Sequence, residues 1–310
     1  MQEGVAVLVP ASAGTPGRLR VGLALGFGVA VLSSASILIK KAEAPSLVIA
    51  AGRLLVASLV LAPFFWIRFP KLRSQLGREK WSLVVLAGLL LAAHFALWVE
   101  SLRHTTVASS VVLVATDPIF VAVASPLILH ERVSGRLATA VGLGVVGMMV
   151  IAGPGLWSGL VTRGNLLALG GAACAAGYLL VGRRVRPEMD LLPYIYILYS
   201  VAGVLLLAGT LAARQRFTGY PGTVYLWIVL LGLGPQLIGH TTFNWALRYL
   251  NAPAVGMAIL GEPVGATILA WLLLRETPAW FELTGGAIIL AAVYLAIVSR
   301  HRLQVKVPNG

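Results

Sequence analysis

Charged residues are scarce in this chain. Asp, Glu, Lys and Arg make up 11% of its 310 residues, whereas a soluble domain carries about 25%. Hydrophobic residues make up 58%, and the mean hydropathy is +0.89. A water-soluble fold is hard to reconcile with this composition. At roughly 20 residues per span, plus loops, the length accommodates about ten membrane-spanning helices, so we expect an all-α integral membrane protein.

Acidic residues and cysteine are scarcer still. The 11 acidic residues face 24 basic ones, which leaves a net charge of +13. In a soluble protein this balance would suggest nucleic acid, but here the basic residues lie mostly in short stretches between apolar runs. Such residues hold loops in the cytoplasm, so we expect a lipid bilayer and no nucleic acid as partner. The single cysteine, Cys174, cannot form an intrachain disulfide.

The chain also lacks the residue patterns that enzyme chemistry needs. It contains no nucleophile-base constellation, no Gly-rich phosphate loop and no Cys/His set with metal-ligand spacing. His94 and His240 have no third ligand at a plausible spacing. We therefore expect neither an enzyme nor a cofactor or metal. An integral-membrane enzyme, which would turn over substrate in detergent, and a channel, which would show conductance, are distant alternatives.

A repeated segment is the most informative feature present. Residues 102–152 superpose without a gap on residues 247–297, 145 positions later. In each copy an apolar helix carries an acid-proline pair at its middle, Asp117-Pro118 or Glu262-Pro263, and leads into a second apolar helix. Duplicated halves with interrupted helices are typical of transporters that bind substrate near the bilayer centre. Leu102, Arg103, Pro118, Leu127, Leu129, Glu131 and Thr139 match Leu247, Arg248, Pro263, Leu272, Leu274, Glu276 and Thr284.

Ten apolar stretches are the expected spans. Lys and Arg are more numerous in the tails and loops on the side of the membrane that holds the N-terminus than in the loops on the other side. We therefore expect both termini in the cytoplasm. Five helices per half is an odd number, so the second half, 164–299, must be inverted relative to the first, 18–153. Residues 1–17 and 300–310 are expected to be cytoplasmic tails, the first disordered. The spans are 19–39, 46–66, 81–101, 106–128, 137–153, 165–182, 191–212, 223–246, 253–274 and 280–299.

Three charged residues are expected deep in the bilayer, where each costs roughly 2.5–3.5 kcal/mol. Asp117 and Glu262 lie midway along their helices, each before a proline that frees a backbone carbonyl. They could face a cavity and bind protons or a substrate ammonium group, or satisfy nearby donors where the helix is broken. Arg53 could bind a substrate carboxylate, or pair with one of these acids and hold two helices together.

Polar and aromatic residues on other helices complete the candidate site. Gln236, His240 and Asn244 follow at i, i+4 and i+8, so they share one helix face that lines a cavity or bonds to neighbouring helices. His94 and Trp98 also share a face, and His94 could be a proton relay or a satisfied core residue. Tyr178 offers an aromatic ring with a polar tip. The candidate substrate-binding residues are therefore Arg53, His94, Trp98, Asp117, Tyr178, Gln236, His240 and Glu262.

The order of several short motifs resembles the drug/metabolite transporter superfamily, in its ten-helix EamA-type carriers, over residues 19–299. The resemblance implies transport of small metabolites, often amino acids, through a central cavity between the halves, by one chain in a bacterial inner (plasma) membrane. Unlike the small multidrug relatives, the first helix lacks an acid, and the seventh has no arginine matching Arg53. The motifs are Ala50-Ala51-Gly52-Arg53-Leu54, Asp117-Pro118-Ile119-Phe120, Glu131-Arg132, Gly164-Asn165-Leu166, Glu262-Pro263-Val264 and Leu273-Leu274-Arg275-Glu276.

We expect a secondary transporter, an exporter of amino acids or related zwitterions, that works by alternating access as a monomer. Arg53 would lie near the substrate carboxylate and Glu262 or Asp117 near its ammonium group. The alternative is proton-coupled efflux of lipophilic cations at the same acids. The charged pairs that end the repeated helices, Glu131-Arg132 and Arg275-Glu276, are expected to fix helix depth or latch a closed gate.

Overall fold

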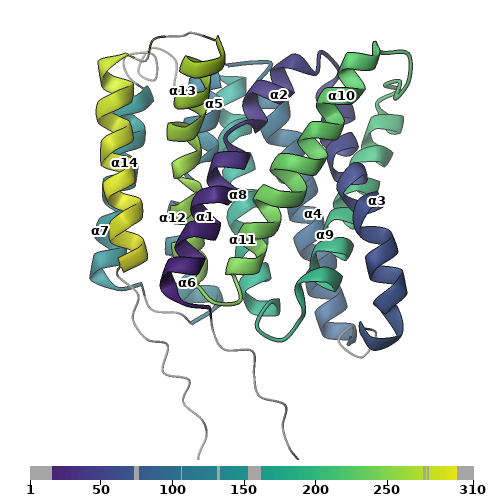
Figure 1. Cartoon of the computed structure of the whole chain (residues 1–310), viewed down its shortest axis with the longest axis horizontal. Coiled ribbons are helices and arrows are strands. Elements are labelled where there is room, and N and C mark those ends of the chain that lie inside the picture. Colours follow the sequence, from purple (N-terminus) through teal and green to yellow (C-terminus); the bar gives the residue numbers. More distant parts are fainter. Residues whose placement is uncertain are drawn as a thin grey trace, which may run out of the picture.

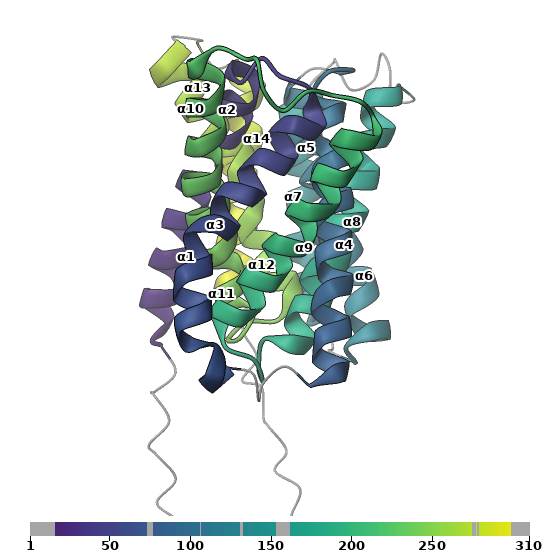
Figure 2. The same ribbon diagram turned by 90° about the vertical axis from the view of Figure 1, so that its right-hand side faces the viewer.

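The computed structural model describes residues 16–72, 77–105, 107–130, 133–152, 162–274, 277 and 279–298, and all regular secondary structure within these ranges is helical. The helices align along one common axis, and the start of α1 and the end of α14 lie at the same end of the bundle (Figures 1 and 2). This end is called the terminal end below, and the other the distal end. The charged tails and the latch residues Glu131, Arg132, Arg275 and Glu276 lie outside the described residues.

The first half contains seven helical segments. They are α1 (Arg18–Leu32), α2 (Ala35–Lys41), α3 (Ser46–Leu72), α4 (Arg78–Ser101), α5 (Val107–Val114), α6 (Asp117–Ile128) and α7 (Gly135–Ala152). The second half contains α8 (Arg163–Val185), α9 (Leu191–Ala212), α10 (Gly222–Leu231), the π-helix η3 (Gly232–His240), α11 (Thr241–Ala246), α12 (Ala252–Ile259), α13 (Gly261–Leu274) and α14 (Trp280–Val298).

The repeat extends through the whole of both halves. Helices of the second half begin 144 or 145 residues after their counterparts in the first, at Arg18 and Arg163, Ser46 and Leu191, Arg78 and Gly222, Val107 and Ala252, and Gly135 and Trp280. Two pairs of counterparts also pack against each other, namely α3 with α9 and α7 with α14. The backbone of the two halves is therefore related helix by helix, and the halves meet through equivalent elements.

Most helices are long enough to cross a bilayer. Within the described residues, eight are sufficiently long and apolar, and two shorter apolar helices, Gly135–Val150 and Leu283–Ala296, lie where the remaining spans are expected. Large apolar side chains such as Leu23, Phe27 and Ile67 are exposed on the outer surface, as a lipid-facing surface requires. The all-helical membrane fold is therefore confirmed, while the count of ten spans and the inversion of the halves stay predictions.

Two expected helices are broken at equivalent places. The span expected at 106–128 divides into α5 and α6 at Ala115–Thr116, and the span expected at 253–274 divides into α12 and α13 at Leu260. The cause is the proline that follows each break. Pro118 and Pro263 have no N–H to offer the carbonyl four residues earlier, and those carbonyls belong to the last residues of α5 and α12. Each acid, Asp117 or Glu262, therefore begins the second part of a broken helix.

Two further breaks occur only once. The span expected at 19–39 divides at Ser33–Ser34, where the Ser33 hydroxyl donates to the Val29 carbonyl at 2.8 Å and the Ser34 hydroxyl to the Val31 carbonyl at 2.8 Å. Serine hydroxyls compete with backbone donors in this way and bend helices. The span expected at 223–246 contains the nine-residue π-helix η3 around Pro235. Such segments are rare and concentrate at functional sites.

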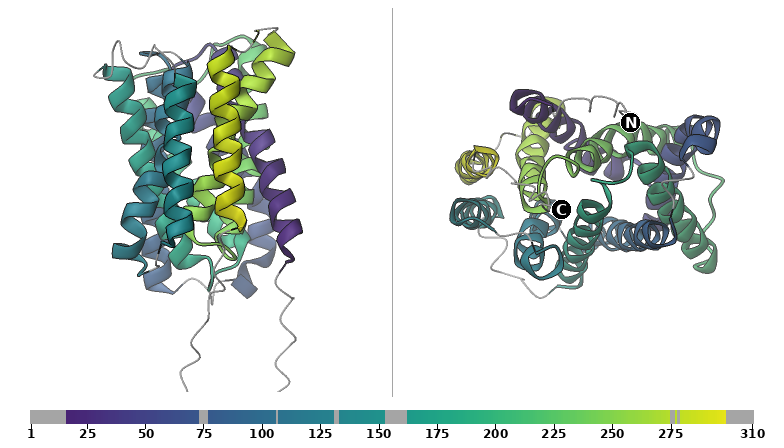
Figure 3. Two further views of the ribbon diagram at one scale, coloured as in Figure 1. Left: turned by 90° about the vertical axis from the view of Figure 1, so that its left-hand side faces the viewer. Right: turned by 90° about the horizontal axis from the view of Figure 1, so that it is seen from below.

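The main hydrophobic core lies between the halves, and α7 and α14 pack side by side at one edge of the bundle (Figure 3). The contact between these two helices depends on small residues, because a Cβ atom on Gly147 would lie 2.9 Å from the Gly285 carbonyl oxygen. A second, smaller core, which includes Val112, Met148, Leu260 and Ile289, joins this pair to α5 and α12.

Candidate functional site

A small cavity lies between the two halves at the helix breaks. Its volume is about 30 Å³, and about 10–15 Å³ is enough for one water molecule. In this conformation the cavity therefore admits a few small molecules of solvent size, and a metabolite requires the helices to move. The lining residues come from α1, α4, α5, α6, α8, η3, α12 and α13: Leu32, His94, Trp98, Val114, Ala115, Asp117, Ala175, Tyr178, Leu179, His240, Ile259 and Glu262.

Two carboxyl groups from equivalent positions of the repeat meet at this cavity. Asp117 is the first residue of α6 and Glu262 the second of α13, and their side chains are 3% and 7% exposed. Asp117 Oδ2 and Glu262 Oε1 have no hydrogen-bond partner among the described residues. The two groups repel each other when charged, and this repulsion is strong away from water. Unpartnered acceptors facing one cavity suit a ligand that donates hydrogen bonds or carries positive charge.

His94 and Trp98 form one wall of the cavity. The Nδ1 atom of His94 lies 2.9 Å from the Gly171 carbonyl oxygen, and since a carbonyl can only accept, Nδ1 carries the proton. The Nε2 atom is then left as the second polar atom of the ring. The His94 and Trp98 rings stack, with centroids 5.9 Å apart and an interplanar angle of 16°. The Trp98 Nε1 donor has no partner among the described residues.

Tyr178 and His240 also line the cavity. The Tyr178 hydroxyl lies 3.4 Å from His240 Nδ1, a long hydrogen bond between α8 and η3. The His240 ring packs edge-on against Phe95, with centroids 5.3 Å apart. The structure thus brings six of the eight sequence candidates, His94, Trp98, Asp117, Tyr178, His240 and Glu262, to one cavity.

The other two candidates, Arg53 and Gln236, are fully buried but do not line the cavity. All three guanidinium nitrogens of Arg53 and both amide atoms of Gln236 lack hydrogen-bond partners among the described residues. The Arg53 guanidinium carbon lies 4.2 Å from the centroid of the Phe95 ring, a cation–π contact. Glu262 attracts Arg53 more strongly than any other group around it, but within the described residues no ion pair joins Arg53 to an acid.

The third member of the polar stripe, Asn244, bonds to neighbouring helices. Its Nδ2 atom donates to the Tyr199 hydroxyl at 3.4 Å, and its backbone carbonyl accepts from Arg186 Nε at 2.9 Å. Arg186 lies in one of the short basic stretches between apolar runs that the sequence assigns to loops, yet it is 1% exposed and also donates to the Met189 carbonyl. Burial lowers the pKa of Arg186 to about 10, so it remains charged at neutral pH. In the sequence, a basic residue that is buried at a helix end looks the same as a basic residue that is exposed in a cytoplasmic loop.

The terminal end of the bundle is tied together by charged groups. Arg248 lies 3.3 Å from Asp190, Lys80 lies 3.1 Å from Glu188, and Arg183 donates to the Leu247 carbonyl at 2.9 Å. These contacts link α4, α8, the turn between α8 and α9, and the turn after α11. Together with Arg186 they connect the helices and turns of the terminal end.

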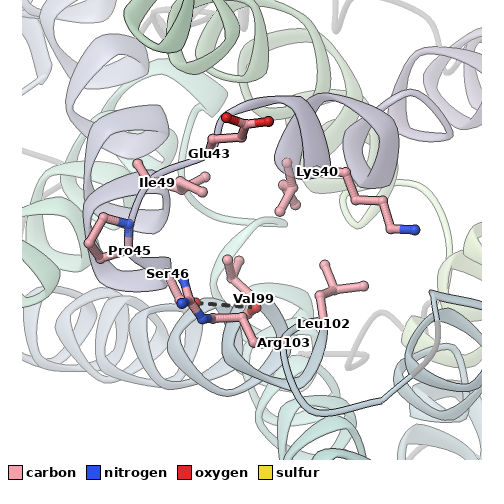
Figure 4. Close-up of a pocket in the computed structure, with 10 residues that line it drawn as sticks. Lys40, Glu43, Pro45, Ser46, Ile49, Val99, Leu102 and Arg103 are labelled. Atoms are coloured by element: carbon pink, nitrogen blue, oxygen red, sulfur yellow. Dashed lines mark hydrogen bonds between the residues drawn. The ribbon is translucent and has the colours of Figure 1, made fainter. Parts of the chain in front are cut away.

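The distal end is hollowed instead. A pocket of about 460 Å³ lies between α2, α3 and α4, lined by residues that include Lys40, Glu43, Ser46 and Arg103. Figure 4 shows Lys40 and Arg103 on different sides of it, with Glu43 along a third. Val99 lines this pocket while its neighbour Trp98 lines the central cavity. The nearby Glu100 lies 2.8 Å from His104 Nε2.

Comparison with protein families decides the class of this chain. The model of the EamA-like transporter family matches residues 20–153 and 162–298. The chain belongs to the EamA-like transporter family. The two matched segments coincide with the two structural halves, which confirms the resemblance drawn from the sequence motifs. Each half of this EamA-like chain therefore has one helix that is broken at an acid-proline pair, with the acid at the cavity.

Several relatives of this EamA-like chain are named as transporters, and the names of two Escherichia coli relatives, YtfF and YedA, place them in the inner membrane. An uncharacterized transporter of Archaeoglobus fulgidus is 24% identical over 80% of this chain and 86% of its own length. The riboflavin transporter of Brucella anthropi is 25% identical over 81% and 88%. The uncharacterized inner membrane transporter YedA of Escherichia coli K12 is 27% identical over 84% and 85%. This protein is therefore a membrane transporter.

A solved structure has the same fold. One crystal structure of a protein superposes with a TM-score of 0.74 and 16% sequence identity, covering 93% of this EamA-like chain and 100% of the other. At this identity the likeness extends to the fold, and the fold alone does not specify a substrate. The chemistry of the cavity must therefore decide which solutes this chain carries.

Proposed function

We propose that this protein is a secondary transporter that exports small metabolites, amino acids or related zwitterions in particular, by alternating access through the central cavity. The observation that carries the proposal is the meeting of Asp117 and Glu262, equivalent acids of the two halves, at one buried cavity with an unpartnered oxygen each. A substrate ammonium group donates up to three hydrogen bonds, and its positive charge is opposite to that of the two carboxylates. An ammonium group bound there would give a hydrogen-bond donor to the unpartnered oxygens of both Asp117 and Glu262.

Alternating access rests on the proposed membrane arrangement. We place ten spans across the membrane as two inverted five-helix repeats, with both termini in the cytoplasm of a cell whose inner membrane holds the protein. The terminal end, tied by ion pairs, is then the closed cytoplasmic end, and the distal pocket of about 460 Å³ is the outer mouth. The residues that line the cavity come from both halves of the chain, and we propose the monomer as the transporting unit.

A second candidate is proton-coupled efflux of lipophilic cations. The observation in its favour is the aromatic lining, Trp98 and Tyr178, beside the two acids, since aromatic faces and carboxylates both attract organic cations. The buried charge of Arg53 opposes it, because a cation would be repelled and a zwitterion attracted. Arg53→Ala should therefore abolish zwitterion export but spare resistance to toxic cations.

Efflux from proteoliposomes tests the proposal. Vesicles containing the protein are loaded with a mixed pool of amino acids, nucleosides, riboflavin and organic cations, and mass spectrometry identifies what leaves. Vesicles with Glu262→Gln serve as control. Selective loss of zwitterions, absent in the control, is the expected result. Efflux of cations alone, dependent on a proton gradient, would support the second candidate instead. Efflux of riboflavin alone would indicate a substrate like that named for the Brucella anthropi relative.

A further inference from the structure

A second buried polar compartment lies beside the central cavity. It contains the guanidinium of Arg53 on α3 and the amide of Gln236 on η3, both fully buried and without hydrogen-bond partners among the described residues. The Tyr199 hydroxyl joins them, because it lies 3.4 Å from the Gln236 backbone carbonyl and interacts electrostatically with Arg53. The two helices are in close contact here, since a Cβ atom on Gly232 would lie 2.9 Å from the Arg53 carbonyl oxygen.

Phe95 contacts both Arg53 and residues that line the cavity. One face of its ring carries the Arg53 guanidinium at 4.2 Å. The same ring contacts His94, Trp98 and His240, with centroids 4.8, 6.3 and 5.3 Å away, and all three of these residues line the cavity. Phe95 is itself fully buried and lines no part of the cavity. The ring therefore contacts the Arg53 guanidinium and also three residues of the cavity wall.

We infer that Arg53 and Gln236 form a subsite for a single carboxylate group, and that Phe95 closes this subsite until a substrate displaces the ring. The inference rests on the proposed function and deepens it, because it gives the zwitterion two separate binding points. The ammonium group binds Asp117 and Glu262 in the cavity, and the carboxylate binds Arg53 and Gln236 behind the ring.

The chemistry of the compartment selects a carboxylate. A guanidinium presents a planar fork of donors that matches the two oxygens of a carboxylate. The aromatic face now against Arg53 offers attraction without any acceptor atom, so a carboxylate that replaces it gains the hydrogen bonds that the nitrogens of Arg53 lack. The Gln236 Nε2 group supplies a further neutral donor, and its Oε1 atom can accept from the substrate side.

The π-helix connects the two compartments. His240 lines the cavity and Gln236, four residues earlier, lies in the second compartment, and both belong to η3. A π-helix has a wider turn than an α-helix, and a change between the two rotates its side chains relative to neighbouring helices. Movement of η3 would therefore change both binding points together, which suits a site that must release both ends of its substrate.

Chemical modification of Arg53 tests whether Phe95 closes the subsite. The full-length protein in detergent is treated with methylglyoxal, a small arginine reagent, and the modification of Arg53 is followed by peptide mass spectrometry. Phe95→Ala should raise the rate by about tenfold or more, and Phe95→Leu, which keeps bulk but removes the aromatic face, by less. Phe65→Ala is the matched control, because Phe65 is a buried phenylalanine on the same helix as Arg53 that stacks on Tyr196 at 4.3 Å. An unchanged rate in both Phe95 variants, or an equal rise in Phe65→Ala, would overturn the inference.

Protection by a simple anion tests the carboxylate class. Sodium acetate should slow modification of Arg53 in Phe95→Ala, whereas acetamide at the same concentration should not, and adding Gln236→Leu should weaken the protection. Equal protection by acetate and acetamide would contradict the subsite. Modification needs no transport, so its outcome is independent of the vesicle experiment. A protein that exports zwitterions without acetate protection would keep its proposed function and lose this subsite.

Discussion

In the first half of the chain, Asp117 follows a helix break and reaches the central cavity; in the second half, Glu262 follows the equivalent break and reaches the same cavity. The buried cation Arg53, by contrast, occurs in only one half. Arg53 occupies α3, and its counterpart on α9, 145 residues later, is Leu198. Likewise the counterparts of Gln236 and His240 are Leu91 and Phe95. The halves therefore share the backbone and the acids but not the residues around Arg53.

This difference shows how a duplicated fold can hold an asymmetric solute. Acids at equivalent positions of both halves provide two matched acceptors for one positive group. A cation present in only one half gives the site a direction, because a zwitterion can bind in a single orientation. Substituting equivalent residues in the two halves separates what the repeat provides from what one half adds.

The largest effects on substrate affinity are expected from the two acids. Hydrogen bonds to charged groups are worth about 1.5–3 kcal/mol, which corresponds to roughly ten- to hundred-fold in binding. Asp117→Asn and Glu262→Gln should each weaken substrate affinity by about this much and to a similar degree, because the two acids occupy equivalent positions. Affinity would be measured from the concentration dependence of initial efflux rates. A large effect of one substitution and none of the other would show that only one half carries the acceptor.

Arg53 and its counterpart Leu198 should respond in opposite ways. Replacing buried charges by apolar residues is often neutral or stabilising by about 1–4 kcal/mol, so Arg53→Leu should hold or raise the melting temperature while zwitterion efflux falls. Leu198→Ala removes fully buried apolar volume and should destabilise the protein by about 2–5 kcal/mol, with a smaller effect on substrate selectivity. Thermal unfolding in detergent and vesicle efflux measure the two quantities. Joint loss of stability and transport in Arg53→Leu would make Arg53 a structural residue.

The basic residues near the ends of the equivalent segments differ in burial. Arg186 bonds two backbone carbonyls, whereas its counterpart Lys41 is exposed and lies 5.1 Å from the Trp227 ring. Arg186→Ala leaves both carbonyls unpaired and should destabilise the closed terminal end by about 2–5 kcal/mol. Lys41→Ala should change stability by about 0.5–1 kcal/mol. Amide hydrogen exchange in the turn after α8 should be faster in Arg186→Ala than in Lys41→Ala. Equal exchange rates in the two variants would show that Arg186 does not stabilise this end of the bundle.

A smaller effect is expected where α1 contacts α13. A Cβ atom on Gly265 would lie 2.1 Å from the Ser33 hydroxyl oxygen, and Ser33 also donates to the Glu262 carbonyl at 3.2 Å. Gly265→Ala should therefore destabilise the protein by about 1–3 kcal/mol. Its counterpart Phe120 is 40% exposed, and Phe120→Ala should change stability by less than about 0.5 kcal/mol. The combination Ser33→Gly with Gly265→Ala should recover most of the loss if the clash is the cause.

Much of this arrangement could be predicted from the sequence. The acid-proline pairs predict interrupted helices, because the loss of one backbone donor is a local property of Pro118 and Pro263. The break at Ser33–Ser34 was not predicted, because serines in apolar helices usually leave the helix intact, and the bonds of both hydroxyls to carbonyls of the preceding turn appear only in the structure. The stripe of Gln236, His240 and Asn244 assumed an α-helix, and the π-helix instead leaves only His240 at the cavity.

The position of Arg53 shows the same limit. Its helix and depth follow from the apolar pattern, but the pattern cannot specify which neighbouring side chain shields it from the cavity. Phe95 drew no attention in the sequence because an aromatic residue in an apolar helix is ordinary. A shielding role depends on the packing of α3 against α4 and η3, which arises only in the folded bundle.

The central claim is that the two halves build one binding site, and a double-mutant cycle on the acids tests it most directly. Initial zwitterion efflux is measured for wild type, Asp117→Asn, Glu262→Gln and the double variant in the same vesicles. Residues that share one ligand deviate from additivity by about 0.5–3 kcal/mol, so the loss in the double variant should differ from the product of the single losses by up to about a hundredfold. A double loss within about twofold of that product, the behaviour of independent sites, would contradict the account.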